Sequence, residues 1–139
     1  MGYTIGEAAK ISGLTPHTLR YYDKAGLLPF LERTESGLRN FRDGDIAWLS
    51  IINCLKSTGM SIKDIKQYIT WCQMGDNTIE KRREAFVKQK EIVEEQMREY
   101  QKYLDTINYK IRYYDEALEA GTEKIHDSKN CYSTYEKSK

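Results

Sequence analysis

Few side chains in this 139-residue chain could carry out covalent chemistry, and the three cysteines come first. They are Cys54, Cys72 and Cys131, and an odd number without short spacing disfavours both a disulfide framework and a four-thiolate metal site. A thiolate can instead add to an electrophilic carbonyl, provided that its pKa is low and the sulfur is accessible. Neither His17 nor His126 is adjacent to a cysteine in the sequence, and the sequence contains no glycine-rich phosphate loop or catalytic carboxylate pair. We therefore expect no enzyme active site, no metal centre and no cofactor.

The helical pattern predicts different surroundings for Cys54 and Cys72. On a helical wheel, at about 100° per residue, Cys54 falls on the flank of one apolar stripe, whereas Cys72 continues another. The centre of the first stripe is formed by Trp48, Ile51, Ile52 and Leu55. The second stripe is formed by Ile62, Ile65 and Ile69. Cys72 is therefore expected to be a small core residue, while Cys54 is either inert packing, which the residues alone favour, or a reactive thiol.

The composition suits one modest globular unit joined to an elongated, well-solvated part. Hydrophobic residues make up 40% of the chain and charged residues 31%. The chain does not begin with charges followed by an apolar run, and no stretch approaches the roughly 18 apolar residues of a membrane span, so we expect a soluble, cytoplasmic protein without a membrane partner. The formal net charge is only +1, but residues 10–42 hold twice as many basic as acidic residues. The basic character is therefore local.

Residues 4–23 carry the signals of two short helices joined by a tight turn. Thr4 and Glu7 form a capping-box pattern at the start of the first helix. Thr15 and Pro16 restart the chain as N-cap and first helical residue, because the missing amide hydrogen of proline costs nothing there. One side of the second helix is apolar, and the opposite side consists of His17, Arg20, Tyr21 and Lys24. We therefore expect a helix-turn-helix with a polar, aromatic and cationic outer face.

A short hairpin is expected to follow, over about residues 31–41. Its turn lies around Ser36 and Gly37, and its strands carry Arg33 and Arg39. A hairpin that carries arginines beside such a helix is called a wing.

Helical signals then continue to residue 120. Two helices, over about 46–56 and 61–73, complete a first unit of residues 1–75. In residues 76–120 apolar residues recur with a heptad period, and so narrow a stripe on a charged helix needs a partner helix, most simply that of a second subunit. The expected dimer seam consists of Val93, Met97, Tyr100, Leu104, Ile107, Ile111, Tyr114 and Leu118. Residues 121–139 show no periodicity and are expected to be disordered.

Several separated motifs follow one another in the first part of the chain: YTIGEAA (3–9), TLRYYD (18–23), GLLP (26–29) and GLRNF (37–41). In this order, they resemble the motifs of the MerR family of bacterial regulators. The resemblance implies a mainly α fold, with a winged helix-turn-helix and a long dimerisation helix that forms an antiparallel coiled coil in the dimer. It also implies a homodimer that sits on the over-long spacer of double-stranded promoter DNA and distorts it, so that bacterial RNA polymerase can read both promoter elements.

The resemblance places the DNA-contacting residues on the second helix and the wing. They are expected to be Thr18, Arg20, Tyr21, Lys24, Arg33 and Arg39, and the resemblance implies that Arg39 on the wing holds a phosphate. The physical interpretation agrees, because cations bind phosphates while a helix presents a few side chains to base edges in the major groove. Taken one at a time, such residues more often form an ordinary solvated surface. Their grouping on a helix beside a wing favours DNA contact.

The resemblance also bears on the trigger. A helix and a tail leave no room for a separate ligand-binding domain, which disfavours a large effector. Metal-sensing members have a cysteine at the start of the dimerisation helix, where this chain has NTI (77–79), and iron–sulfur members need clustered cysteines. Cys54 resembles the single reactive cysteine of aldehyde-responsive members, which implies a response to aldehydes, other electrophiles or thiol stress. Two alternatives stay open: a metal or other small effector, with a metal held by Cys54 and Cys72 across the dimer, and a coiled-coil adaptor for a protein partner.

Overall fold

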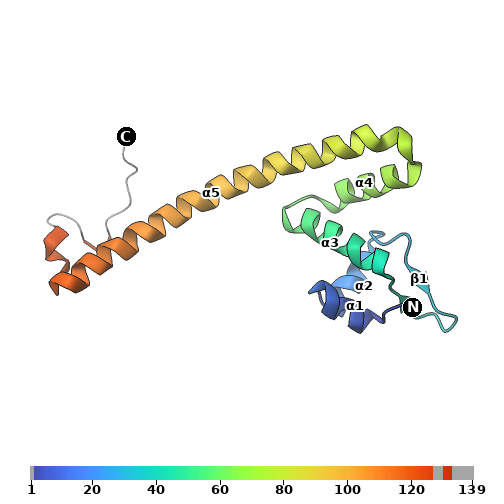
Figure 1. Ribbon diagram of the computed structural model, residues 1–139, viewed down its shortest axis with the longest axis horizontal. Coiled ribbons are helices and arrows are strands. Elements are labelled where there is room, and N and C mark those ends of the chain that lie inside the picture. Colours follow the sequence, from blue (N-terminus) through green and yellow to red (C-terminus); the bar gives the residue numbers. More distant parts are fainter. Residues whose placement is uncertain (1, 127–129, 133–139) are drawn as a thin grey trace. The chain divides into compact units, whose positions relative to one another are not determined.

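The computed structural model describes residues 2–126 and 130–132, and the chain divides into two compact units, Met1–Glu91 and Ile92–Lys139. The helices and strands are α1 (Ile5–Ser12), α2 (Pro16–Lys24), β1 (Glu32–Arg33), β2 (Arg39–Asn40), α3 (Asp43–Ser57), α4 (Ile62–Met74), the 3-10 helix η1 (Asp76–Thr78), α5 (Ile79–Ala120) and the 3-10 helix η2 (Glu123–His126) (Figure 1). The expected fold, mainly helical with a winged helix-turn-helix and a long C-terminal helix, is confirmed. None of the helices in the described part of the chain is long and apolar enough to cross a membrane.

Side-chain caps determine where α1 and α2 begin. The hydroxyl of Thr4 accepts a hydrogen bond from the amide of Glu7 (3.2 Å). In return, the carboxylate of Glu7 accepts one from the amide of Thr4 (3.0 Å), and this bond lowers the pKa of Glu7. α1 ends at Gly13, whose φ of 72° lies in the left-handed region that glycine adopts without strain. Thr15 then caps α2 by accepting from the amide of Thr18 (3.1 Å), so the tight turn between the helices is set by local sequence.

The wing is the antiparallel hairpin of β1 and β2, in which Arg33 pairs with Arg39. Gly37 lies in its turn with a φ of 85°. Directly after the wing, Phe41 forms two backbone hydrogen bonds with Tyr3, of 2.6 and 3.0 Å, and its ring is fully buried. The base of the wing is therefore attached to the segment that leads into α1.

The core of the first unit consists of apolar side chains from the first four helices and the loops between them. Its buried members are Ala8, Ala9, Leu19, Tyr22, Leu27, Leu28, Phe41, Leu49, Ile52, Leu55, Ile65 and Ile69. On α3 the apolar stripe differs from the expected one, because Trp48 is half-buried and Ile51 is exposed while Leu49 is buried. Trp48 lies at the rim of the core, where its indole N–H donates to the carbonyl of Leu27 (2.9 Å). A buried indole N–H needs a polar partner, which Trp48 finds at the rim of the core and not at its centre. The prediction from hydrophobicity alone therefore placed the centre of the apolar stripe wrongly.

A polar junction joins α4 to α5. Thr78 is buried, and its hydroxyl lies 2.5 Å from the carbonyl of Trp71 and 2.8 Å from that of Gly75. Arg82 donates from Nε to the Thr78 hydroxyl (3.1 Å) and from Nη2 to the Gly75 carbonyl (3.1 Å). These bonds satisfy carbonyls at the end of α4, which the helix itself leaves without partners, and they position the start of α5.

In the second unit, the segment after α5 folds back on that helix. The hydroxyl of Tyr113 donates to the carboxylate of Glu123 (2.8 Å), and its ring stacks on His126 with 4.1 Å between the centroids. Tyr113 is consequently only 3% exposed. The structure therefore differs from the expected disorder at residues 121–126, because a stacked and hydrogen-bonded aromatic pair holds them; most of the remaining tail lies outside the described residues.

Candidate nucleic-acid interface

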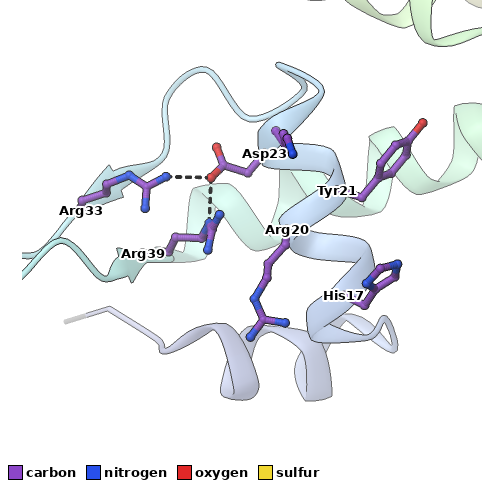
Figure 2. Close-up of a pocket in the computed structure, with 7 residues that line it drawn as sticks. His17, Arg20, Tyr21, Asp23, Arg33 and Arg39 are labelled. Carbon is purple, nitrogen blue, oxygen red and sulfur yellow. Dashed lines mark hydrogen bonds and ion pairs between the residues drawn. The ribbon is translucent and has the colours of Figure 1, made fainter.

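Helix α2 presents a cationic and aromatic face away from the core. Leu19 and Tyr22 are buried, so the helical register turns Arg20, Tyr21 and Lys24 outward, and all three are exposed. In Figure 2, Tyr21 projects from the side of α2 that lies away from the wing. The helix thus offers side chains that can reach both phosphates and base edges.

A shallow groove of about 570 Å³ lies between α2 and the wing. It is lined by His17, Arg20, Tyr21, Asp23, Lys24, Arg33 and Arg39. The fold therefore brings together five of the six residues that the sequence predicts to contact DNA, from a helix and a hairpin that are separated in the chain.

Thr18, the sixth of these residues, has a different environment. It is half-buried, and its hydroxyl lies 2.9 Å from the hydroxyl of Thr15, the cap residue of α2. Its side chain therefore takes part in the cap at the start of the helix, and DNA contact by Thr18 stays a prediction.

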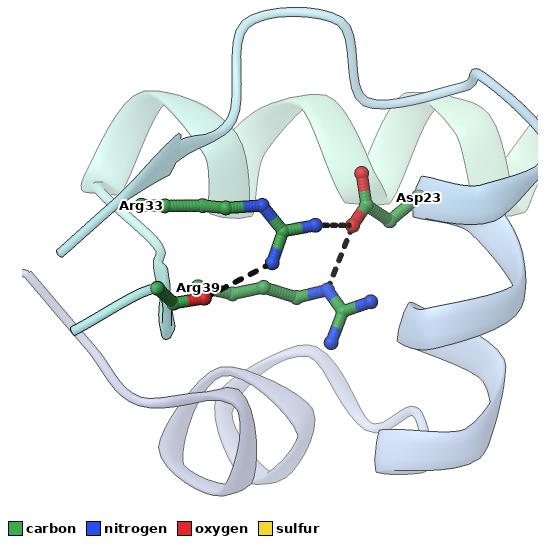
Figure 3. Close-up of polar contacts among 4 residues, drawn as sticks. Asp23, Arg33 and Arg39 are labelled. Atoms are coloured by element: carbon green, nitrogen blue, oxygen red, sulfur yellow. Dashed lines mark hydrogen bonds and ion pairs between the residues drawn. The ribbon is translucent and has the colours of Figure 1, made fainter. Parts of the chain in front are cut away.

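A single carboxylate on α2 holds both wing arginines (Figures 2 and 3). Oδ2 of Asp23 accepts hydrogen bonds from Nε of Arg39 (2.7 Å) and from Nη2 of Arg33 (3.1 Å). Arg33 also donates from Nη1 to the carbonyl of Gly37 (3.3 Å) in the turn of the wing. In the sequence, Asp23 is only an acidic residue within a basic segment, and nothing there shows which arginines its carboxylate meets.

Together these groups suit the binding of double-stranded DNA. Lysine and arginine neutralise phosphates, and a helix of this kind fits the major groove. A hairpin beside the helix can follow the backbone, which fixes the register of the helix on the duplex.

The three cysteines lie in different surroundings. Cys54, in the last turns of α3, and Cys131 are exposed, whereas Cys72 is half-buried. Cys72 lies beside Tyr68; burial of the phenol and its hydrogen bond with this thiol raise the pKa of Tyr68 to about 12. Cys72 is thus packed against an aromatic side chain, and Cys54 is the accessible thiol of the first unit. Among the described residues, no three His, Cys, Asp or Glu side chains are grouped closely enough to hold a metal ion.

Comparison with known proteins identifies the family. Residues 3–70 match the family described as MerR HTH family regulatory protein, and residues 46–109 match the one described as MerR, DNA binding. An uncharacterized HTH-type transcriptional regulator of Haemophilus influenzae is 46% identical over 124 residues, which cover 89% of this chain and 92% of that protein. This chain belongs to the MerR family.

Solved structures resemble this MerR-family chain over most of its length. The crystal structure of HiNmlR, described as a MerR family regulator lacking the sensor domain and bound to promoter DNA, is 46% identical with a TM-score of 0.79, over 90% of this chain and 99% of that one. A MerR family regulator of Bacillus thuringiensis is 45% identical with a TM-score of 0.74, over 81% and 98% of the two chains. The MerR-family chain is therefore a DNA-binding transcriptional regulator and not an enzyme.

A further relative is the HTH-type transcriptional regulator AdhR of Bacillus subtilis. It is 42% identical over 79 residues, which cover 57% of this chain and 56% of AdhR. The similarity to AdhR spans about half of each protein.

The residues expected for a dimer seam form an apolar row on α5 of the MerR-family chain. Val93 is half-buried, and the other members are exposed. Those exposed members are Met97, Tyr100, Leu104, Ile107, Ile111, Tyr114 and Leu118. Within a single chain, the row therefore remains largely uncovered.

Proposed function

We propose that this regulator acts as a homodimer on double-stranded promoter DNA and activates transcription by distorting the promoter spacer for RNA polymerase. The observation that carries the proposal is the groove between α2 and the wing, where four basic side chains gather. They are Arg20, Lys24, Arg33 and Arg39. In the proposal α2 enters the major groove and the wing lies on the phosphate backbone. The description of HiNmlR as bound to promoter DNA supports the choice of promoter DNA as the ligand.

The apolar row on α5 supports the homodimer. Its side chains include Tyr100, which is 71% exposed, and Leu118, which is 79% exposed. Burial of apolar surface contributes roughly 25 cal/mol per Å², so the row favours association with a second apolar surface. The heptad spacing fits the same helix of a second copy, running antiparallel. Two DNA-reading units held at a fixed separation could then bind two half-sites.

A charge in the row tests the dimer. Leu104→Glu places a carboxylate in the proposed seam, whereas Asn108→Glu places the same charge on an exposed position outside it. We expect sedimentation equilibrium to show a monomer for Leu104→Glu and a dimer for Asn108→Glu, and an electrophoretic shift on the regulator's own promoter only for the latter. A Leu104→Glu protein that remains dimeric would contradict the proposed seam.

Promoter variants test the distortion. If the bound regulator compensates for an over-long spacer, a promoter with a shortened spacer should be transcribed without it. In transcription with purified polymerase, the regulator should activate the natural promoter and leave the shortened one unchanged. Equal activation of both would favour recruitment of polymerase over distortion of DNA.

We propose Cys54 as the trigger of the switch. Its exposure on α3 supports this role, since a sensing thiol must be reached by its electrophile. The thiolate would attack the carbonyl carbon of an aldehyde to form a C–S bond. The π electrons of the carbonyl would move to its oxygen, which takes up the proton that the thiol released, and the product is a hemithioacetal.

Single cysteine variants test the trigger. Cys54→Ser should abolish induction of the promoter by formaldehyde or methylglyoxal and leave DNA affinity nearly unchanged. Cys72→Ser and Cys131→Ser are the matched controls and should respond as the natural protein does. Intact mass should show the adduct whenever Cys54 is present. Full induction of Cys54→Ser would rule out this thiol as the sensor.

A further inference from the structure

Asp23 is a carboxylate in a place where negative charge is unfavourable. It is the penultimate residue of α2, and the C-terminal end of a helix already carries partial negative charge. It also lines the groove proposed to face DNA, which is itself a polyanion. Its side chain is nevertheless only 17% exposed, so it gains little from solvation by water. Such a carboxylate requires compensating partners, and the wing supplies them.

The wing, in contrast, places two positive charges close together. Arg33 and Arg39 lie directly opposite each other in the register of β1 and β2, so their side chains extend from the same face of the hairpin. Like charges in that arrangement destabilise a hairpin. Oδ2 of Asp23 accepts a hydrogen bond from each guanidinium, as Figure 3 shows. The carboxylate therefore relieves the repulsion and at the same time attaches the wing to α2.

The two arginines use their donors differently. Arg33 engages both terminal nitrogens, Nη2 with Asp23 and Nη1 with the carbonyl of Gly37. Arg39 donates a hydrogen bond only from Nε. Its side chain is 24% exposed, whereas that of Arg33 is 51% exposed. Within the described residues, the terminal nitrogens of Arg39 have no hydrogen-bond partner. A guanidinium that is oriented through Nε presents those two nitrogens as a fork, which matches the oxygens of a phosphate.

We propose that Asp23 is a positioning residue, which orients the wing so that Arg39 binds a backbone phosphate while Arg33 braces the hairpin. The proposal rests on the proposed placement of α2 and the wing on DNA. The family resemblance already implies a phosphate contact for Arg39, and the proposal adds a positioning role for Asp23 and a bracing role for Arg33.

The variant Asp23→Asn distinguishes a positioning role of Asp23 from a purely electrostatic effect on DNA affinity. Asp23→Asn makes the surface more positive, so electrostatics alone predicts tighter binding to all DNA. Positioning predicts the opposite for the promoter: affinity falls about tenfold as an oriented phosphate contact is lost, while binding to unrelated DNA of equal length stays the same or tightens. Glu32→Gln is the matched control, since Glu32 is an exposed wing carboxylate that pairs with Arg42. It should bind both DNAs at least as tightly as the natural protein.

Substitutions of the arginines test the division of roles. In fluorescence anisotropy at several salt concentrations, Arg39→Gln should reduce the salt slope by about 0.9 for each subunit that contacts DNA, and Arg33→Gln should leave it nearly unchanged. Arg39→Lys keeps the charge but lacks the fork, so it should bind the promoter weakly as well. Asp23→Asn combined with Arg39→Gln should bind no more weakly than Arg39→Gln alone, because both remove the same contact. Asp23→Glu should recover part of the lost affinity.

Several outcomes would overturn the proposal. It fails if Asp23→Asn binds the promoter as tightly as the natural protein, or if Arg33→Gln and Arg39→Gln reduce the salt slope equally. If Asp23→Asn does not fold, as judged by circular dichroism, the comparison of the arginine variants decides. If neither these variants nor Arg20→Gln changes the slope, the placement of α2 and the wing on DNA is wrong, which is a separate failure.

Discussion

The side-chain amide of Gln89, on α5, lies 2.7 Å from the hydroxyl of Thr58, at the end of α3. Gln89 is buried, and the same nitrogen is 3.4 Å from the carbonyl of Thr58. The Thr58 hydroxyl in turn lies 2.9 Å from the carbonyl of Cys54. A short chain of hydrogen bonds therefore leads from the residue proposed as the trigger to the helix proposed to form the dimer.

The first prediction concerns the strength of this link. Gln89→Leu should lower the free energy of unfolding by about 1–2 kcal/mol, because Thr58 loses a buried hydrogen-bond partner. Thr58→Val should have a similar effect, and the double variant should lose less than the two single losses added together. Urea denaturation measures all three. Gln101→Leu, on an exposed part of α5, is the control and should change stability by less than about 0.5 kcal/mol. Additive losses would show that Gln89 and Thr58 act independently.

The second prediction concerns transmission. An allosteric response needs an element that both sites influence, and we propose that the hydrogen bond between Thr58 on α3 and Gln89 on α5 is this element. Gln89→Leu should therefore weaken induction by formaldehyde even though Cys54 still forms its adduct. Promoter activity and intact mass, measured on the same samples, separate the two steps. Unchanged induction would mean that the signal from α3 reaches the dimer by another route.

The third prediction concerns the cap of α1. Thr4→Ala should lower the free energy of unfolding by about 1 kcal/mol, because the amide of Glu7 loses its acceptor, and Thr4→Ser should restore it. The lowered pKa of Glu7 makes this cap dependent on pH. Its contribution is present above the ordinary value of 4.5 and is lost as the pH falls through the lowered pKa. Glu7→Gln keeps an acceptor without titrating, so its unfolding should depend less on pH in the acid range. An equally steep acid dependence would contradict the cap.

Local signals in the sequence were sufficient to predict the helices of the DNA-binding unit. Thr4 and Glu7 cap α1, and Thr15 caps α2, through hydrogen bonds between residues three apart. The spacing in the sequence therefore predicts these contacts directly. The outward face of α2 follows equally from periodicity, once Leu19 and Tyr22 are assigned to the core.

Contacts between distant residues could not be predicted in this way. In the sequence, Asp23 is one acidic residue among basic ones. Only the register of the wing brings Arg33 and Arg39 within hydrogen-bond distance of its carboxylate. The burial of Tyr113 depends on stacking with His126, which follows α5 in a segment without periodicity. Such pairs are specified by tertiary packing, and neither spacing nor composition encodes them.

The last prediction concerns this aromatic pair. Burial of its ring and the hydrogen bond to Glu123 raise the pKa of Tyr113 above the ordinary value of 10.0. The folded segment therefore favours the neutral phenol of Tyr113. The contribution of this phenol to stability is complete below about pH 10, and it is lost as the pH rises through the raised pKa. Tyr113→Phe keeps the stacked ring but removes the hydrogen bond, so η2 should be cleaved faster by trypsin at Lys124 near neutral pH.

The tyrosinate absorbance provides the second readout of that prediction. The natural protein should contain one more late-ionising tyrosine than Tyr113→Phe, because the raised pKa of Tyr68 gives a late step in both proteins. Tyr114→Phe is the control, because Tyr114 is adjacent in sequence but 45% exposed, and it should keep both the late step of Tyr113 and the protection of Lys124. Equal cleavage of the natural protein and Tyr113→Phe would mean that the contacts of His126, its stacking on residue 113 and its bond to the carbonyl of that residue, hold the segment without help from the bond to Glu123.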